Sequence, residues 1–126
     1  MSELERILYV EDEDDIREVA KLALEAVGGF VVKLCANGER ALAEAEAFKP
    51  DLILLDVMMP GMDGPTTLQR LRASPGLETT PVIFMTAKVQ PSEVAHFKSL
   101  GALDVIPKPF DPMRLADQIR AIAGGA

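Results

Sequence analysis

Four apolar runs of the chain each end in a polar residue suited to phosphate or metal chemistry. The runs end at Glu11 and Asp12, at Asp56, at Thr86 and at Lys108. If the runs are parallel strands, these endings lie at the same edge of one sheet, where open α/β sheets bind their ligands. Carboxylates, a hydroxyl and an amine would then converge in one pocket. Such a set is typical of a Mg²⁺-dependent site for phosphoryl transfer.

The three acids at these strand ends, Glu11, Asp12 and Asp56, would lie close enough to repel one another. Neighbouring strands are about 4.8 Å apart, and like charges at such a distance raise the pKa of carboxylates. A hard divalent cation with oxygen ligands removes this conflict, so Mg²⁺ is the expected ion and Mn²⁺ can replace it. The alternative is a solvated acidic turn before a helix, which describes Glu13 and residues 14–15 better.

Asp56 is the candidate nucleophile, because a carboxylate can form a covalent acyl phosphate. Positive charge must then neutralise the phosphoryl oxygens, and Lys108 supplies part of it. Thr86 can donate a hydrogen bond to a phosphoryl oxygen, and the backbone N–H groups of Val57 and Ala87 are further candidate donors. Each residue alone is weak evidence, so the hypothesis depends on their joint placement.

Aliphatic segments typical of buried strands alternate with amphipathic segments typical of helices. The predicted strands are residues 7–10, 30–36, 52–55, 81–85 and 103–106. The predicted helices are residues 14–27, 39–48, 66–73, 91–100 and a last helix capped by residues 111–112. Continuous apolar strands indicate a parallel sheet covered on both faces. The sequence therefore predicts one α/β domain over residues 1–126, a flavodoxin-like, doubly wound sheet of five strands in the order 2-1-3-4-5 with five helices.

Periodicity also predicts which side chains form the core. The first helix is expected to bury one face, made of Ile16, Val19, Ala20, Ala23 and Val27. The last helix is expected to bury Leu115, Ile119 and Ile122.

The composition is that of an acidic globular domain. The chain has 126 residues, of which 48% are hydrophobic and 26% charged, and its formal net charge is −7. This charge argues against nonspecific binding to nucleic acids or anionic membranes, which requires positive charge. No apolar stretch approaches the roughly 18 residues of a membrane span, and the acidic start is unlike a signal peptide. The single cysteine, Cys35, is expected to be buried and suits a cytoplasmic protein.

The motifs resemble those of the receiver domain of bacterial two-component response regulators, the CheY-like family. Four stretches carry the resemblance, which extends over essentially the whole chain: residues 7–12, 51–64, 81–87 and 108–110. The resemblance implies a phosphorylation-dependent signalling switch. In this switch Asp56 accepts a phosphoryl group from the phosphohistidine of a sensor histidine kinase or of a phosphotransfer protein.

The resemblance also implies a metal ligand set. Asp12 and Asp56 would ligate Mg²⁺ directly, with the backbone carbonyl of Met58 as the third protein ligand. Glu11 would act through a metal-bound water. The chain carries Glu11 where Asp is commoner in the family, which lengthens the side chain and keeps its charge.

On the phosphoryl side, the resemblance implies that Thr86 and Lys108 contact the transferred group and that the Lys108–Pro109 bond is cis. A change on this side of the domain would alter the affinity for a downstream protein. If dimers form, the fourth helix, the fifth strand and the fifth helix are the expected face. Val105 stands where many receivers carry an aromatic ring, so the usual coupling of such a ring to the threonine is not expected.

Two residues are expected to flank the mouth of the pocket, because they lie two positions past Asp56 and Thr86. These are Met58 and Lys88. Side chains at these positions in receivers control the access of water. We expect Lys88 to interact with the phosphoryl group or with an acid of the pocket.

Two other functions fit part of the pattern. A phosphatase of the haloacid-dehalogenase type needs a second acid two residues after its nucleophile, where this chain has Met58. A phosphorylation-independent, receiver-like protein-interaction module usually lacks the acceptor or the lysine, and this chain keeps Asp56 and Lys108. The favoured function is the signalling switch, which catalyses only its own phosphoryl transfer and dephosphorylation and acts on no external metabolite.

Overall fold

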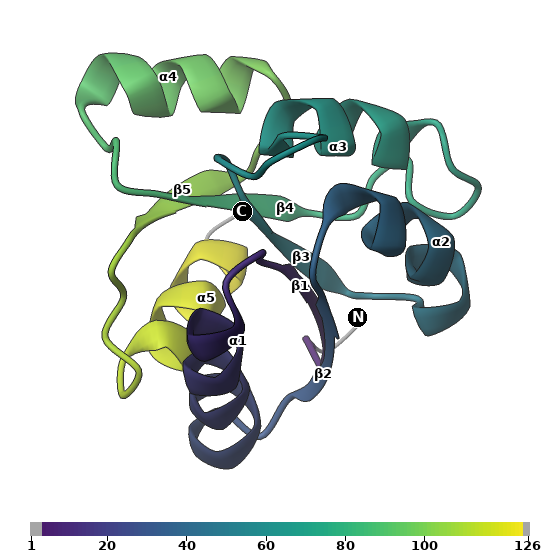
Figure 1. The fold of residues 1–126 in the computed structure, drawn as a ribbon. Coiled ribbons are helices and arrows are strands. Elements are labelled where there is room, and N and C mark those ends of the chain that lie inside the picture. Colours follow the sequence, from purple (N-terminus) through teal and green to yellow (C-terminus); the bar gives the residue numbers. More distant parts are fainter. Residues whose placement is uncertain (1–3, 125–126) are drawn as a thin grey trace.

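A five-stranded parallel sheet lies at the centre of the computed structural model, which describes residues 4–124 (Figure 1). Its strands are β1 (Arg6–Val10), β2 (Val31–Cys35), β3 (Leu52–Asp56), β4 (Val82–Thr86) and β5 (Asp104–Pro107). They follow the order β2-β1-β3-β4-β5 with all neighbours parallel, which confirms the predicted topology. The order reverses between β1 and β3, so the switch point lies where the acids were predicted.

Helices cover both faces of the sheet. They are α1 (Asp14–Lys21), its π-helical continuation η1 (Leu22–Val27), α2 (Gly38–Phe48), α3 (Gly64–Arg72), α4 (Pro91–Ser99) and α5 (Leu115–Gly124). Figure 1 shows α1 and α5 together on one face and α2, α3 and α4 on the other. Within residues 4–124 no helix combines the length and the apolar character that crossing a bilayer requires.

The core consists of two apolar layers, one on each face of the sheet. Successive strand residues point to opposite faces, so Leu8 and Val10 pack with α2, α3 and α4, and Ile7 and Tyr9 pack with α1, η1 and α5. The free thiol of Cys35 is buried as predicted, and burial raises its pKa to about 11. The two layers pack against opposite faces of the strands and so fix the strand ends that carry the predicted site.

The predicted core face of the first helix is partly wrong. Ala20 and Ala23 are buried, but Val19 and Val27 are 42% and 43% exposed, and Leu24 is buried instead. The helix changes to π-helical geometry from residue 22 onward. The wider π turn takes one more residue, which rotates the later side chains about the axis.

The last helix begins later than predicted. The Asp111 side chain accepts a hydrogen bond from the backbone N–H of Met113 at 2.9 Å, and its carbonyl accepts from Arg114 and Leu115 at 3.0 Å each. Asp111 therefore starts a turn that leads into α5, and the helix itself begins at Leu115. Leu115 and Ile119 are buried as predicted, and Ile122 is partly buried against the same layer.

Candidate functional site

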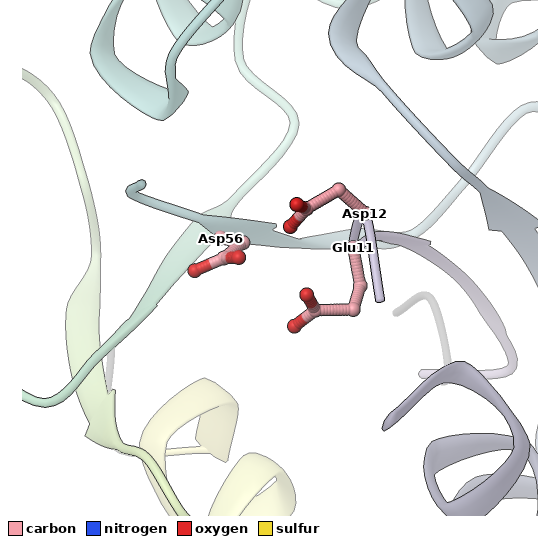
Figure 2. Close-up of side chains that lie close together, drawn as sticks. All are labelled: Glu11, Asp12 and Asp56. Carbon is pink, nitrogen blue, oxygen red and sulfur yellow. The ribbon is translucent and has the colours of Figure 1, made fainter. Parts of the chain in front are cut away.

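The strand register brings the predicted acids together. Val10 of β1 lies opposite Leu55 of β3, so the next positions, Glu11 and Asp56, lie side by side. Figure 2 shows the side chains of Glu11, Asp12 and Asp56 gathered at this edge of the sheet. Carboxylate oxygens of all three residues lie within 4.8 Å of one another. This cluster of hard oxygen donors could hold a metal ion.

Lys108 places a positive charge between two of these acids. Its Nζ lies 2.8 Å from Glu11 Oε1 and 3.2 Å from Asp56 Oδ2. The backbone holds it there, because the N–H of Lys108 donates to the carbonyl of Thr86 at 2.9 Å directly after β5. The Lys108–Pro109 peptide bond is cis, as the resemblance implied.

The site holds more negative charge than Lys108 neutralises. Glu11 is fully buried and Asp56 is only 4% exposed. Burial, and after it the charge of Glu11, raise the pKa of Asp56 to about 7, although Lys108 opposes both effects. Burial lowers the pKa of Lys108, but its hydrogen bond to Glu11 and the charges of both acids raise that pKa overall. An added cation would relieve this imbalance.

An open cavity of about 250 Å³ lies over these groups. Its lining contains most of the predicted site: Asp12, Glu13, Asp56, Met58, Thr86, Ala87, Lys88 and Lys108. Glu11 is not part of the lining because it is fully buried. Thr86 is only 4% exposed, and its Oγ1 accepts a hydrogen bond from the backbone N–H of Lys88 at 3.1 Å.

The residues at the rim partly match the predictions. Met58 and Lys88 flank the cavity as predicted, and Met58 is 69% exposed. Among residues 4–124, however, Lys88 forms no ion pair with a pocket acid. The backbone N–H of Val57, a candidate donor to a phosphoryl oxygen, instead donates to the carbonyl of Met85 at 3.1 Å. This N–H extends the hydrogen bonding between β3 and β4.

Two residues that support Glu11 were missed as parts of the site. Arg17 of α1 donates from Nη1 to the Glu11 carbonyl at 2.6 Å and also pairs with Asp14. The Tyr9 hydroxyl donates to Glu11 Oε1 at 3.4 Å. The alternation of β1 places Tyr9 on the same face as Glu11, so this neighbour was readable from the sequence.

Comparison with known proteins agrees with this geometry. Residues 7–120 match the family model of the response regulator receiver domain. The transcriptional regulatory protein CseB of Streptomyces avermitilis is 41% identical over 122 residues, covering 97% of this chain and 50% of that protein. The DNA-binding response regulator MtrA of Mycolicibacterium smegmatis is 36% identical over 117 residues, covering 93% of this chain and 50% of MtrA.

A solved structure shows the same architecture. The chemotaxis protein CheY4 of Vibrio cholerae superposes with a TM-score of 0.87 at 29% identity, covering 95% of this chain and 99% of that chain. The chain spans about half the length of the curated relatives that it matches. The family match extends over residues 7–120, and the relatives exceed 30% identity over nearly the whole chain. The chain therefore belongs to the receiver domains of response regulators, the phosphorylation-dependent switches of two-component signalling.

Proposed function

We propose that this chain is a signalling switch in which Asp56 accepts a phosphoryl group from the phosphohistidine of a sensor histidine kinase or of a phosphotransfer protein. The observation that carries the proposal is the placement of Asp56. Its Oδ2 lies 3.2 Å from Lys108 Nζ, and it lines one cavity together with Thr86 and Asp12. The nucleophile Asp56, the ammonium of Lys108 and the hydroxyl of Thr86 therefore lie together where a phosphoryl group would bind.

In the proposed transfer, an ionised oxygen of Asp56 attacks phosphorus. The new P–O bond forms as the P–N bond to the donor imidazole breaks, and the imidazole leaves with that electron pair. Lys108 is placed to neutralise the phosphoryl oxygens, and Thr86 Oγ1 to donate a hydrogen bond to one of them. Because the pKa of Asp56 is raised to about 7, any added positive charge favours the reactive, ionised form.

The acidic cluster fits Mg²⁺, and Mn²⁺ as a substitute, because all its donors are hard oxygens. Asp12 and Asp56 would bind the ion directly together with the Met58 backbone carbonyl, and Glu11 would act through a water. When bound, the ion supplies the positive charge that offsets the carboxylates and the phosphoryl oxygens.

The output of the switch is a changed affinity for a downstream protein. Phosphorylation adds negative charge beside Thr86 and Lys108, which biases the packing of the loops that carry them. If phosphorylation drives dimerisation, α4, β5 and α5 form the expected face. The chain itself is proposed to act as one receiver domain that catalyses only its own phosphoryl transfer and dephosphorylation.

The test is the intact mass of the protein after incubation with acetyl phosphate and Mg²⁺. We expect a single gain of about 80 Da, one phosphoryl group, in the wild type and no gain after chelation of the metal. Asp56→Asn should gain nothing, whereas Asp117→Asn, the same change on the exposed side of α5, should behave as the wild type.

Failure of the folded wild type to gain this mass would contradict the proposal. An equal gain in Asp56→Asn would place the acceptor elsewhere. If the folded wild type gains no mass, the phosphorylation-independent interaction module becomes the favoured function.

A further inference from the structure

Tyr9 puts a hydroxyl into a layer that is otherwise apolar. Its side chain is fully buried, and its ring packs in the layer between the sheet and the helices α1, η1 and α5. Among the described residues the hydroxyl has one hydrogen-bond partner, Glu11 Oε1 at 3.4 Å. A phenylalanine would fill the same space without a buried polar group, which costs stability unless it is hydrogen-bonded. The hydroxyl therefore has a use that packing alone does not explain.

The strand geometry makes Tyr9 and Glu11 a matched pair. They are two residues apart at the end of β1, so their side chains project from the same face. The carboxylate of a glutamate stands one methylene further from the backbone than that of an aspartate. This extra length lets the Glu11 carboxylate meet both the Tyr9 hydroxyl and the ammonium of Lys108.

The Glu11 carboxylate is held by three donors. Oε1 accepts from Lys108 Nζ at 2.8 Å and from the Tyr9 hydroxyl at 3.4 Å, and Oε2 accepts from the backbone N–H of Glu13 at 3.2 Å. Of these donors, Lys108 is also shared with Asp56 at 3.2 Å. When Lys108 turns to a phosphoryl group on Asp56, Tyr9 is the side-chain donor that remains at Oε1.

We propose that Tyr9 is a positioning residue for the metal site, whose hydroxyl orients the Glu11 carboxylate from inside the core. The proposal deepens the function proposed above, because it assigns a further residue to the same site. It can be tested on metal binding alone, without any phosphoryl transfer.

Tyr9→Phe removes one oxygen atom and leaves the ring in place. We expect calorimetric titration to show a dissociation constant for Mg²⁺ that is about tenfold higher than that of the wild type, the low end of the range for partners of metal-site residues. Ile7→Val is the matched control, because Ile7 is buried on the same face of β1 but lies four residues before Glu11, roughly 13 Å away along an extended strand. This control should bind Mg²⁺ as the wild type does.

A double-mutant cycle separates positioning from general packing. Glu11→Asp withdraws the carboxylate from the Tyr9 hydroxyl but keeps an acid at the site. In this background Tyr9→Phe should cause no further loss of Mg²⁺ affinity. An equal loss in both backgrounds, or unchanged affinity in Tyr9→Phe alone, would overturn the proposal.

The chain also contains its own optical probe of this contact. Tyr9 is the single tyrosine and there is no tryptophan, so tyrosine emission comes from this residue alone. We expect Mg²⁺ to change the emission of the wild type with the calorimetric dissociation constant, and to change that of Glu11→Asp much less. If these results hold but Asp56 is not phosphorylated, the proposed function fails while the role of Tyr9 stands.

Discussion

At the scale of single residues, Asp56 and Glu11 are a source of instability in the metal-free protein. Two carboxylates lie side by side at a buried strand end, and one ammonium, that of Lys108, lies between them. Buried like charges destabilise a fold unless they are neutralised. The arrangement therefore lowers the stability of the metal-free protein, and the same charges attract cations strongly.

Asp56→Asn should stabilise the metal-free protein at pH 8. The folded pKa of Asp56, about 7, lies above its ordinary value of 3.8, so the folded state holds its proton more tightly than the unfolded state. The wild type therefore loses folding stability as the pH rises from about 4 to about 7. The variant does not lose this stability, because asparagine has no carboxyl group to ionise. We expect a gain of about 1–3 kcal/mol at pH 8 that shrinks toward pH 4, measured by urea unfolding with a chelator.

Asp117→Asn is the control for this experiment, because its carboxylate is exposed on α5. Its effect on stability should be small and should not follow the same pH course. A metal-free Asp56→Asn protein that unfolds more easily than the wild type at pH 8 would refute the electrostatic account.

At the scale of elements, α3 begins directly against the strand end that carries Asp56. Asp63 caps the helix, since its Oδ1 accepts from the N–H of Thr66 at 2.9 Å. The N–H of Gly64 donates to the carbonyl of Val57 at 2.9 Å, which holds the helix start on the loop after β3. The position of Asp56 is thus coupled to the first turn of α3.

Gly64→Ala should disturb both the fold and the acceptor. An added Cβ would lie 2.5 Å from the carbonyl oxygen of Asp56 and 2.8 Å from the Cα of Val57, and backbone atoms cannot rotate away. We expect a loss of about 1–3 kcal/mol in urea unfolding and slower phosphorylation in the mass assay. Gly124→Ala, with nothing near its added Cβ, should be neutral or slightly stabilising. Equal stability of the two variants would contradict this packing argument.

α4 has a small anchor in the core. Its one buried residue is Phe97, whose ring packs edge-to-face on Phe84 of β4 with centroids 5.2 Å apart, whereas α5 buries Leu115, Ala116 and Ile119. Weakly anchored elements open more often. We expect the amides of α4 to exchange hydrogen faster than those of α3 and α5, as measured by mass spectrometry. Protection of α4 equal to that of α3 would show that the single anchor is sufficient.

At the scale of the whole molecule, the chain carries a net charge of −7 and spans about half of a relative that is named DNA-binding. DNA affinity depends on neutralising phosphates with positive side chains. We expect this chain alone not to retard duplex DNA on native gels at low salt. Phosphorylation should not change that, because it adds negative charge. Salt-dependent retardation by the chain alone would contradict the expectation.

Much of the architecture and of the site was determined by the sequence. Strand-like runs of four to seven residues that alternate with helical periods leave few folds other than a doubly wound parallel sheet. In such a sheet the carboxyl ends of neighbouring strands meet, whatever the details of packing. For this reason Asp12, Asp56, Thr86 and Lys108 could be predicted to line one pocket, although their roles stay predictions.

Only the tertiary structure decided which groups contact one another at that edge of the sheet. Lys108 lies closer to Glu11 than to Asp56, and the N–H of Val57 donates within the sheet and not into the pocket. Likewise the sequence did not reveal the π-helical geometry of residues 22–27, in which Leu24 is buried and Val27 is exposed. Sequence periods assign side chains to faces, but a hydrogen bond depends on distances of a few tenths of an ångström. Those distances are set by register and close packing across segments that are far apart in the chain.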